Sequence, residues 1–318
     1  MAKELRSRVP RRPRPAILMY HRIADDSFDP WGTVASPGNF ADQLSWLSGN
    51  RTLLPLPRFA ELHRSGSLPA DSLAITFDDG YRCSAEVAAP LLEQFRIPAT
   101  MFLPVEWIEK SATYWWDELE EIVLGHDGDS LHVGGREIAL GQRQSGDRRW
   151  TFGSGPRTPR QSAFDRICRD LSTSSPKDVE SAMGELRRQA GTRTPSAPAK
   201  RPMTPEQVRA VASVLIGFGS HALRHPWLPS LAPDEQALEI GSSVDRCEAL
   251  SGARPVAFAY PFGATDENSR RLVEEAGFNC ACSTEDGGVA PSSSVFSLPR
   301  VHVGNWTAAG LKRALASL

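Results

Sequence analysis

Short apolar runs alternate with amphipathic stretches along most of the chain. The runs that predict buried strands lie at residues 16–19, 73–77, 99–103, 214–218, 256–260, 279–283 and 300–303. Apolar positions at helical spacing predict helices at residues 40–47, 59–63, 83–95, 233–250, 268–276 and 307–318. Because strands that alternate with helices form parallel sheets with the helices outside, the pattern predicts an α/β fold.

About seven such strand–helix units favour a distorted (β/α)7-type barrel over an open sheet. In either architecture the chemistry lies at the carboxyl ends of the strands. The polar clusters of this chain directly follow predicted strands, which is where that rule places a functional site.

Residues 125–201 break the alternation and are rich in Gly, Ser, Arg and Pro. They contain a predicted hairpin at 131–140, turning at Gly134 and Gly135, and a predicted helix near 176–189 with Ser175 as its cap. We interpret the segment as an insertion into a single domain that spans residues 16–318. It is either a mobile lid that sets substrate choice or a decoration packed on the outer helices.

The composition argues against several classes of protein. The 318 residues carry a net charge of −2, so no overall field attracts nucleic acid, and no nucleic-acid-binding motif is present. The five cysteines are scattered without a CxxC pair, which indicates neither a zinc finger nor a disulfide framework. No run approaches the ~20 apolar residues of a transmembrane helix.

The first fifteen residues are strongly basic, with six Lys or Arg against one Glu. Neither the apolar run nor the cleavage site of a secretory signal follows them, so a cytoplasmic location is expected. We interpret residues 1–15 as a flexible tail that either associates weakly with an anionic surface or is simply a solvated end.

Two clusters carry candidate chemistry. In residues 76–80 (TFDDG), Asp78 and Asp79 stand side by side after a strand, and a bound cation would relieve their repulsion. The alternative is a plain strand-to-helix turn with an Asp cap. In residues 219–226 (GSHALRHP), His221 and His225 share one face if the segment is helical, a spacing that suits a divalent metal.

Together, Asp79, His221 and His225 supply one oxygen and two nitrogens. Three protein ligands with open positions are typical of a catalytic metal site. Asp78 is then a free carboxylate beside the metal, as a general base requires.

The chain resembles the polysaccharide deacetylase family, the NodB-homology domain of carbohydrate esterase family 4. The resemblance rests on TFDDG at 76–80, HALRHP at 221–226 and YPFG at 260–263, in order and each after a strand, and on ILMYHRI at 17–23. It implies hydrolysis of a sugar N-acetyl group that depends on a divalent metal, with Zn²⁺ expected and Co²⁺, Ni²⁺ or Mn²⁺ as alternatives.

The resemblance also implies residue roles. Asp78 corresponds to the general base, and Asp79, His221 and His225 correspond to the metal ligands. The backbone N–H of Phe262 corresponds to the oxyanion donor.

Two positions depart from the family pattern. The family often has Arg where this chain has Ala259, and Arg300 is the candidate to orient the base in its place, with a structural ion pair as the alternative. The usual histidine motif of the general acid is absent. His21, which matches members with an upstream first strand, is favoured over His302 as the acid.

The function expected from these residues is an N-deacetylase acting on an N-acetylated sugar or glycan intermediate. The rival interpretations are an O-acetyl esterase or deformylase that uses the same site, and a carbohydrate-binding pseudoenzyme. Trp115 and Trp116 open the insertion region and either stack on a sugar ring or anchor a helix in the core.

Overall fold

The computed structural model describes residues 13–26, 28–191 and 198–318. Most of the basic segment predicted as a tail, residues 1–12, therefore lies outside the described residues. Among the described residues, no helix has both the length and the apolar character needed to cross a bilayer.

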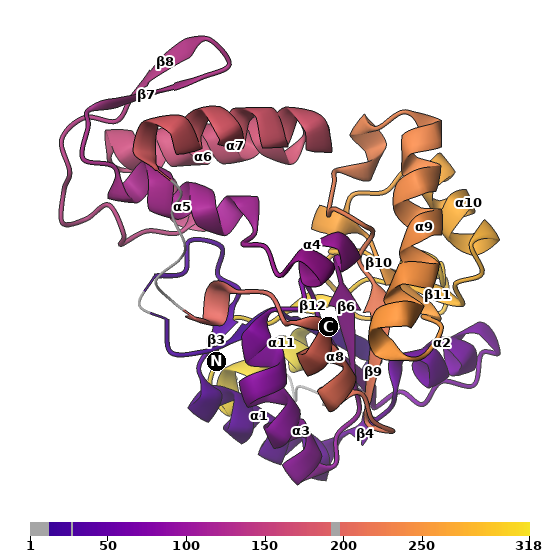
Figure 1. Ribbon diagram of the computed structural model, residues 1–318. Coiled ribbons are helices and arrows are strands. Elements are labelled where there is room, and N and C mark those ends of the chain that lie inside the picture. Colours follow the sequence, from indigo (N-terminus) through magenta and orange to yellow (C-terminus); the bar gives the residue numbers. More distant parts are fainter. Residues whose placement is uncertain (1–12, 27, 192–197) are drawn as a thin grey trace, which may run out of the picture.

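A curled, mostly parallel sheet forms the centre of the fold (Figure 1). Its strands are β1 (Ala16–Tyr20), β4 (Thr52–Leu53), β5 (Ser72–Phe77), β6 (Ala99–Leu103), β9 (Ile216–Ser220), β10 (Ala257–Ala259), β11 (Cys280–Cys282) and β12 (Val301–His302). The main path runs β11-β10-β9-β6-β5-β1-β12, and β4 pairs with β5. All strand pairs of this sheet in the described part of the chain are parallel, which confirms the distorted α/β barrel predicted from the sequence.

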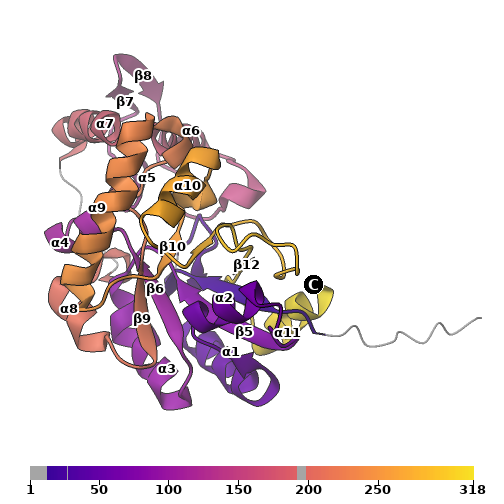
Figure 2. The same cartoon turned by 90° about the vertical axis from the view of Figure 1, so that its right-hand side faces the viewer.

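The helices pack around the sheet (Figures 1 and 2). They are α1 (Pro37–Asn50), α2 (Leu56–Arg64), α3 (Ala89–Phe95), α4 (Val105–Lys110), α8 (Pro205–Val211), α9 (Pro233–Ser251), α10 (Glu267–Glu275) and α11 (Ala308–Ser317). A π-helical turn at Ser84–Ala88 precedes α3, so the helix predicted over 83–95 is interrupted. Short 3₁₀ turns lie at Phe152–Ser154, Pro198–Lys200, Leu228–Ser230 and Pro261–Gly263, and β2 (Arg22–Ile23) pairs with β3 (Val34–Ala35).

The region predicted as an insertion builds its own layer, above the sheet in both views. It contains the hairpin β7 (Ser130–Val133) and β8 (Arg136–Ala139), α6 (Pro159–Ser172) and α7 (Pro176–Ala190). The helix α5 (Trp115–Gly125), just before the predicted boundary at residue 125, packs with them in the same layer. The sequence predicted the hairpin and α7 but missed α6. The layer has an apolar core of its own, to which α5, α6 and α7 each contribute buried side chains.

The predicted strand at 214–218 is observed two residues later, as β9 at Ile216–Ser220. The shift matters because it places Gly219 inside the strand, against Phe102 of β6. A Cβ at Gly219 would lie 2.5 Å from the Phe102 ring and 2.7 Å from the Ala257 carbonyl oxygen. Only glycine therefore permits this approach of β6, β9 and β10.

We expect Gly219→Ala to lower the free energy of unfolding by about 1–3 kcal/mol, because the added methyl overpacks the sheet. Gly217→Ala is the matched control in the same strand, since a Cβ there meets nothing within 4 Å. Urea unfolding of both variants measures the difference. Equal stability of the two would contradict the packing argument.

Candidate active site

The polar clusters predicted from the sequence meet at the carboxyl ends of the strands. A cavity of about 120 Å³ is lined by residues that follow β1, β5, β9 and β10, and its carboxylate and imidazole members are Asp78, Asp79, His21, His221 and His225. The parallel sheet thus brings these five side chains, which lie up to 204 positions apart in the sequence, to one rim.

Asp79 and the two histidines form the centre of this cavity. The Nε2 atoms of His221 and His225 lie 3.5 and 3.4 Å from Asp79 Oδ1. One ligand atom from each of the three residues lies within 4.8 Å of the others. The structure therefore places the three residues predicted as metal ligands next to one another.

The backbone at this rim adopts unusual conformations. Asp79, Ala222, His225 and Phe262 have φ between 56° and 66°, in the left-handed region that non-glycine residues rarely enter. Such strain persists where surrounding packing enforces it and is concentrated at functional sites. His221 and His225 are consequently brought together by a strained turn and not by the helix assumed from their spacing.

His221 is oriented by a second bond from its ring. Its Nδ1 lies 2.7 Å from the Ala259 carbonyl oxygen, which places a proton on Nδ1 and leaves Nε2 free to bind a metal. Burial opposes the charged ring, but the hydrogen bond to Asp79, the charges of Asp78 and Asp79 and the Ala259 carbonyl together outweigh it, so the pKa of His221 is raised.

His225 sits among aromatic rings. Its ring centroid lies 4.5 Å from that of Phe262 and 4.9 Å from that of Trp116. Burial and the neighbouring His221 lower the pKa of His225 to about 3, so the ring is neutral, the form that binds metals. Its Nδ1 is buried and has no hydrogen-bond partner among the described residues.

One carboxylate oxygen and two imidazole nitrogens suit Zn²⁺, and the same donors accept other divalent transition metals. The oriented Nε2 of His221 and the neutral ring of His225 fit such an ion. The Asp79, His221 and His225 cluster is therefore a candidate metal centre with room for further ligands.

Asp78 is held by Arg300. Two nearly parallel bonds of 2.7 Å join the guanidinium to both carboxylate oxygens, and both residues are buried. Burial opposes ionisation, but Arg300, with smaller contributions from His221 and His21, holds the pKa of Asp78 well below its usual range. Arg300 thus contacts Asp78, the residue that it was predicted to orient in place of the arginine that the family often has at the position of Ala259.

Phe262 lies in the turn after β10. Its carbonyl accepts a hydrogen bond of 3.2 Å from the Thr284 hydroxyl, and the next residue, Gly263, has φ +71°. A Cβ at Gly263 would approach Thr284 Oγ1 to 2.0 Å. The close approach of Thr284 therefore requires glycine at position 263, in the turn that carries the cavity-lining Phe262.

His21 lines the cavity, whereas His302 does not. The two ring centroids are 5.7 Å apart. Burial lowers the pKa of His21 despite the opposing charges of Asp79 and Asp78, and it lowers the pKa of His302 to about 4. His21 Nδ1 has no partner within the described part of the chain.

A network of buried hydrogen bonds packs against the site, and the sequence did not predict it. The Trp116 indole donates to the Tyr81 hydroxyl (2.8 Å), which donates to Asp117 (2.9 Å). The Tyr114 hydroxyl donates to the Asp79 carbonyl. Because the Trp116 ring packs on His225, this network positions both ends of the candidate metal centre.

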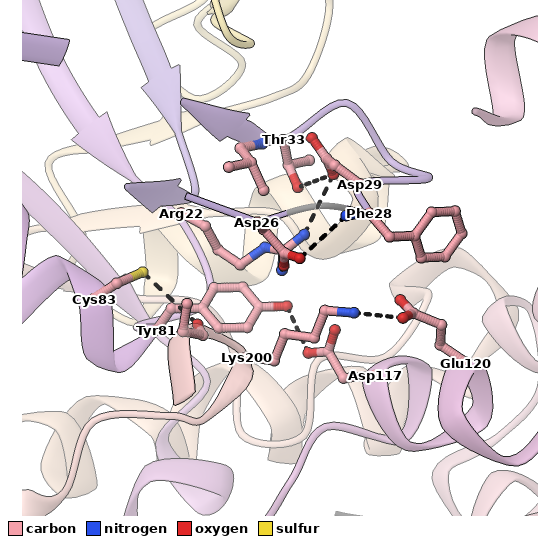
Figure 3. Close-up of polar contacts among 12 residues, drawn as sticks. Arg22, Asp26, Phe28, Asp29, Thr33, Tyr81, Cys83, Asp117, Glu120 and Lys200 are labelled. Carbon is pink, nitrogen blue, oxygen red and sulfur yellow. Dashed lines mark hydrogen bonds and ion pairs between the residues drawn. The ribbon is translucent and has the colours of Figure 1, made fainter. Parts of the chain in front are cut away.

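Figure 3 shows that separate ion pairs lie beside this network. Lys200 reaches Glu120 at 2.5 Å, and Arg22 contacts Asp26 and Asp29 at 2.8 and 3.3 Å. Burial raises the pKa of Asp117 to about 7. Both tandem tryptophans are buried, Trp115 at 4% and Trp116 at 7% exposure, so they anchor α5, although both line the cavity.

The family model of polysaccharide deacetylases matches residues 65–128 and 180–281, just over half of the chain. The chain belongs to the polysaccharide deacetylase family. The resemblance inferred from the sequence motifs is confirmed. Residues 129–179 lie between the two matched segments.

Two curated relatives are each 27% identical over a short segment. The protein YxkH of Bacillus subtilis matches 33% of this chain and 37% of its own length. The poly-β-1,6-N-acetyl-D-glucosamine N-deacetylase of Escherichia coli K12 matches 30% of this chain and 14% of its own length. The chain thus matches well under half of either relative.

Solved structures show the same fold. The Streptococcus pyogenes deacetylase PplD in complex with acetate has a TM-score of 0.60 at 16% identity and covers 95% of this chain and 99% of its own. IcaB from Ammonifex degensii has a TM-score of 0.57 at 17% identity and covers 96% of this chain and 97% of its own.

We expect purified protein to bind one divalent ion per chain and His225→Ala to lose most of it, because the variant removes one of three ligands. His63→Ala is the control, since His63 bonds the Ser293 carbonyl far from this cluster. Elemental analysis after loading with Zn²⁺ measures the content. An equal metal content in all three proteins would contradict the assignment of His225 as a ligand.

Proposed function

We propose that the chain is a metal-dependent hydrolase that removes N-acetyl groups from an amino-sugar substrate. The convergence of Asp79, His221 and His225 beside Asp78 at one sheet rim carries the proposal. Membership of the deacetylase family and the match to an N-acetyl-D-glucosamine polymer deacetylase support it.

The chemistry follows from the residues around the cavity. A divalent ion held by Asp79, His221 and His225 would supply a Lewis acid for the acetyl carbonyl and lower the pKa of a water. Asp78 takes the proton of the attacking water. Each of its oxygens keeps a lone pair beyond the bond to Arg300, so the ion pair orients the base without blocking it.

The remaining steps use Phe262 and His21. The Phe262 backbone N–H donates to the developing oxyanion, from a turn whose geometry the protein fixes in advance. His21 gives a proton to the leaving nitrogen. Its lowered pKa makes the protonated ring a strong donor but reduces the protonated fraction at neutral pH.

A small protonated fraction of His21 favours a second candidate function, that of an O-acetyl esterase that uses the same site. An alkoxide leaves more readily than an amine and depends less on an acid. The two candidates therefore differ in how far they need His21.

We expect Asp78→Asn to lower kcat for acetate release by about 10²–10⁴-fold, because the amide cannot accept the proton. The variant should keep its metal, since Asp78 is no ligand in this assignment. Asp25→Asn, at an exposed aspartate, is the control. Parallel loss of metal and activity in Asp78→Asn would mean that the roles of the two aspartates are assigned wrongly.

We expect His21→Ala to lower release of acetate from an N-acetylated sugar by about 10²-fold or more, and to change hydrolysis of an acetate ester far less. His302→Ala, the neighbouring histidine outside the cavity, should leave both rates near the wild-type values. The assay compares both substrates with all three proteins. Unchanged amide hydrolysis in His21→Ala would favour the esterase, and loss in His302→Ala alone would move the acid to His302.

A further inference from the structure

A second and larger cavity, of about 810 Å³, opens from the candidate active site. His225, Trp115 and Phe262 line both this cavity and the 120 Å³ one. Its volume lies in the upper part of the range of small-molecule sites, so it holds more than the reacting acetamido group and its ring. The cavity therefore has room for the group to which the acetylated sugar is attached.

One wall of this cavity comes from the turn between α6 and α7. The residues that line it are Leu171 and Ser172 at the end of α6, Ser174 in the turn, and Pro176, Lys177 and Val179 at the start of α7. All six lie in residues 129–179, outside the two segments that the family model matches. We call the cavity the insertion groove. Its wall supports a substrate-selecting role of the insertion over the alternative of a peripheral decoration.

The charged groups of the insertion groove are largely neutralised by each other. Arg187 contacts Glu118 at 2.8 Å, Arg224 contacts the buried Glu239 at 2.6 Å, and Lys110 pairs with Glu106. Among the described residues, Lys177 is the lining cation for which no ion pair is found. A pyrophosphate or nucleotide is held by several available cationic donors, so the groove suits an uncharged ligand.

The apolar lining is mostly aliphatic. Leu171, Pro176 and Val179 face the groove from the insertion, and Ala112 and Pro226 line it as well. Three aromatic residues also line the groove, and each is engaged by other parts of the protein. Trp115 is only 4% exposed, the Trp107 ring lies 5.6 and 6.4 Å from the rings of Tyr114 and Trp116, and the Phe262 ring lies 4.5 and 5.8 Å from those of His225 and Trp227. Little aromatic face is therefore left for stacking on a sugar, which is the usual way that proteins use aromatic rings for glycans. The lining thus favours an apolar group over a further sugar ring.

We propose that the insertion groove binds an uncharged, apolar aglycone of the N-acetylated glycoside. This inference rests on the proposed deacetylase function and adds the class of substrate to it. The insertion then selects the substrate, while the residues at the sheet rim perform the hydrolysis.

The test compares acetate release from N-acetylglucosamine, its octyl β-glycoside, chitobiose and UDP-N-acetylglucosamine by the metal-loaded full chain. We expect kcat/KM to be highest for the octyl glycoside, by about tenfold or more over the free sugar, since each buried methylene adds to binding. Val179→Asp, which places a charge in the groove, should abolish this preference. Val179→Ser should reduce it.

The matched control is Ser181→Asp, which adds the same charge to an exposed position of α7 outside the groove lining and should retain the preference. Equal rates of the variants on free N-acetylglucosamine show that the catalytic centre is intact. Higher kcat/KM for chitobiose or for the nucleotide sugar, or a preference that survives in both Val179 variants, overturns the inference. Failure of the wild type to release acetate from any of the four substrates counts instead against the proposed function.

Discussion

Two adjacent carboxylates buried at the end of β5 are the constraint on which the rest of the site depends. Asp78 and Asp79 are 2% and 8% exposed, and two negative charges so placed repel each other and lose their hydration. The fold compensates the charges of the two carboxylates in different ways. Arg300 neutralises Asp78 directly, whereas Asp79 faces His221 and His225, the arrangement of a cation site.

This division separates the two aspartates chemically, although they are neighbours in the chain. The positive φ of Asp79 turns its side chain towards the histidines, while Asp78 remains in line with β5 and bonds Arg300. The proposed base and the proposed ligand thus arise from one dipeptide through a backbone conformation.

The sequence predicted the features that are local. Apolar runs located the strands, and the acids and histidines after those runs located the rim, because parallel strands end on the same side. The helix α6 was missed although Thr158 and Gln161 form a capping box there, since the Gly- and Pro-rich flanks masked the signal. The support of His225 by Trp116, Tyr81 and Asp117 was beyond prediction, because those contacts join α5 to the loop after β5 and follow only from tertiary packing.

Arg300 illustrates how a non-local feature could still be anticipated. The chain has Ala259 where the family often carries an arginine, and a base without a partner implies that another cation replaces it. Ala259 instead offers its carbonyl to His221, so that position now serves the candidate metal centre. The replacement comes from 41 positions further along the chain, just before β12.

Because the arginine comes from residue 300, its side chain also links parts of the sheet. The segment before β12 pairs with β11 through an isolated bridge between Cys282 and Leu298 and through nearby backbone hydrogen bonds, among them that of the Arg300 N–H to the Glu285 carbonyl. The Arg300 side chain adds to this link: its Nε donates to the Ser283 carbonyl after β11, and its other nitrogens reach Asp78 and Thr76 of the β5 region. Thr76 in turn donates to the Leu18 carbonyl of β1. One buried guanidinium therefore compensates the proposed base and ties together three strands across the open part of the barrel, so the stability of the fold and the charge of the base depend on the same side chain.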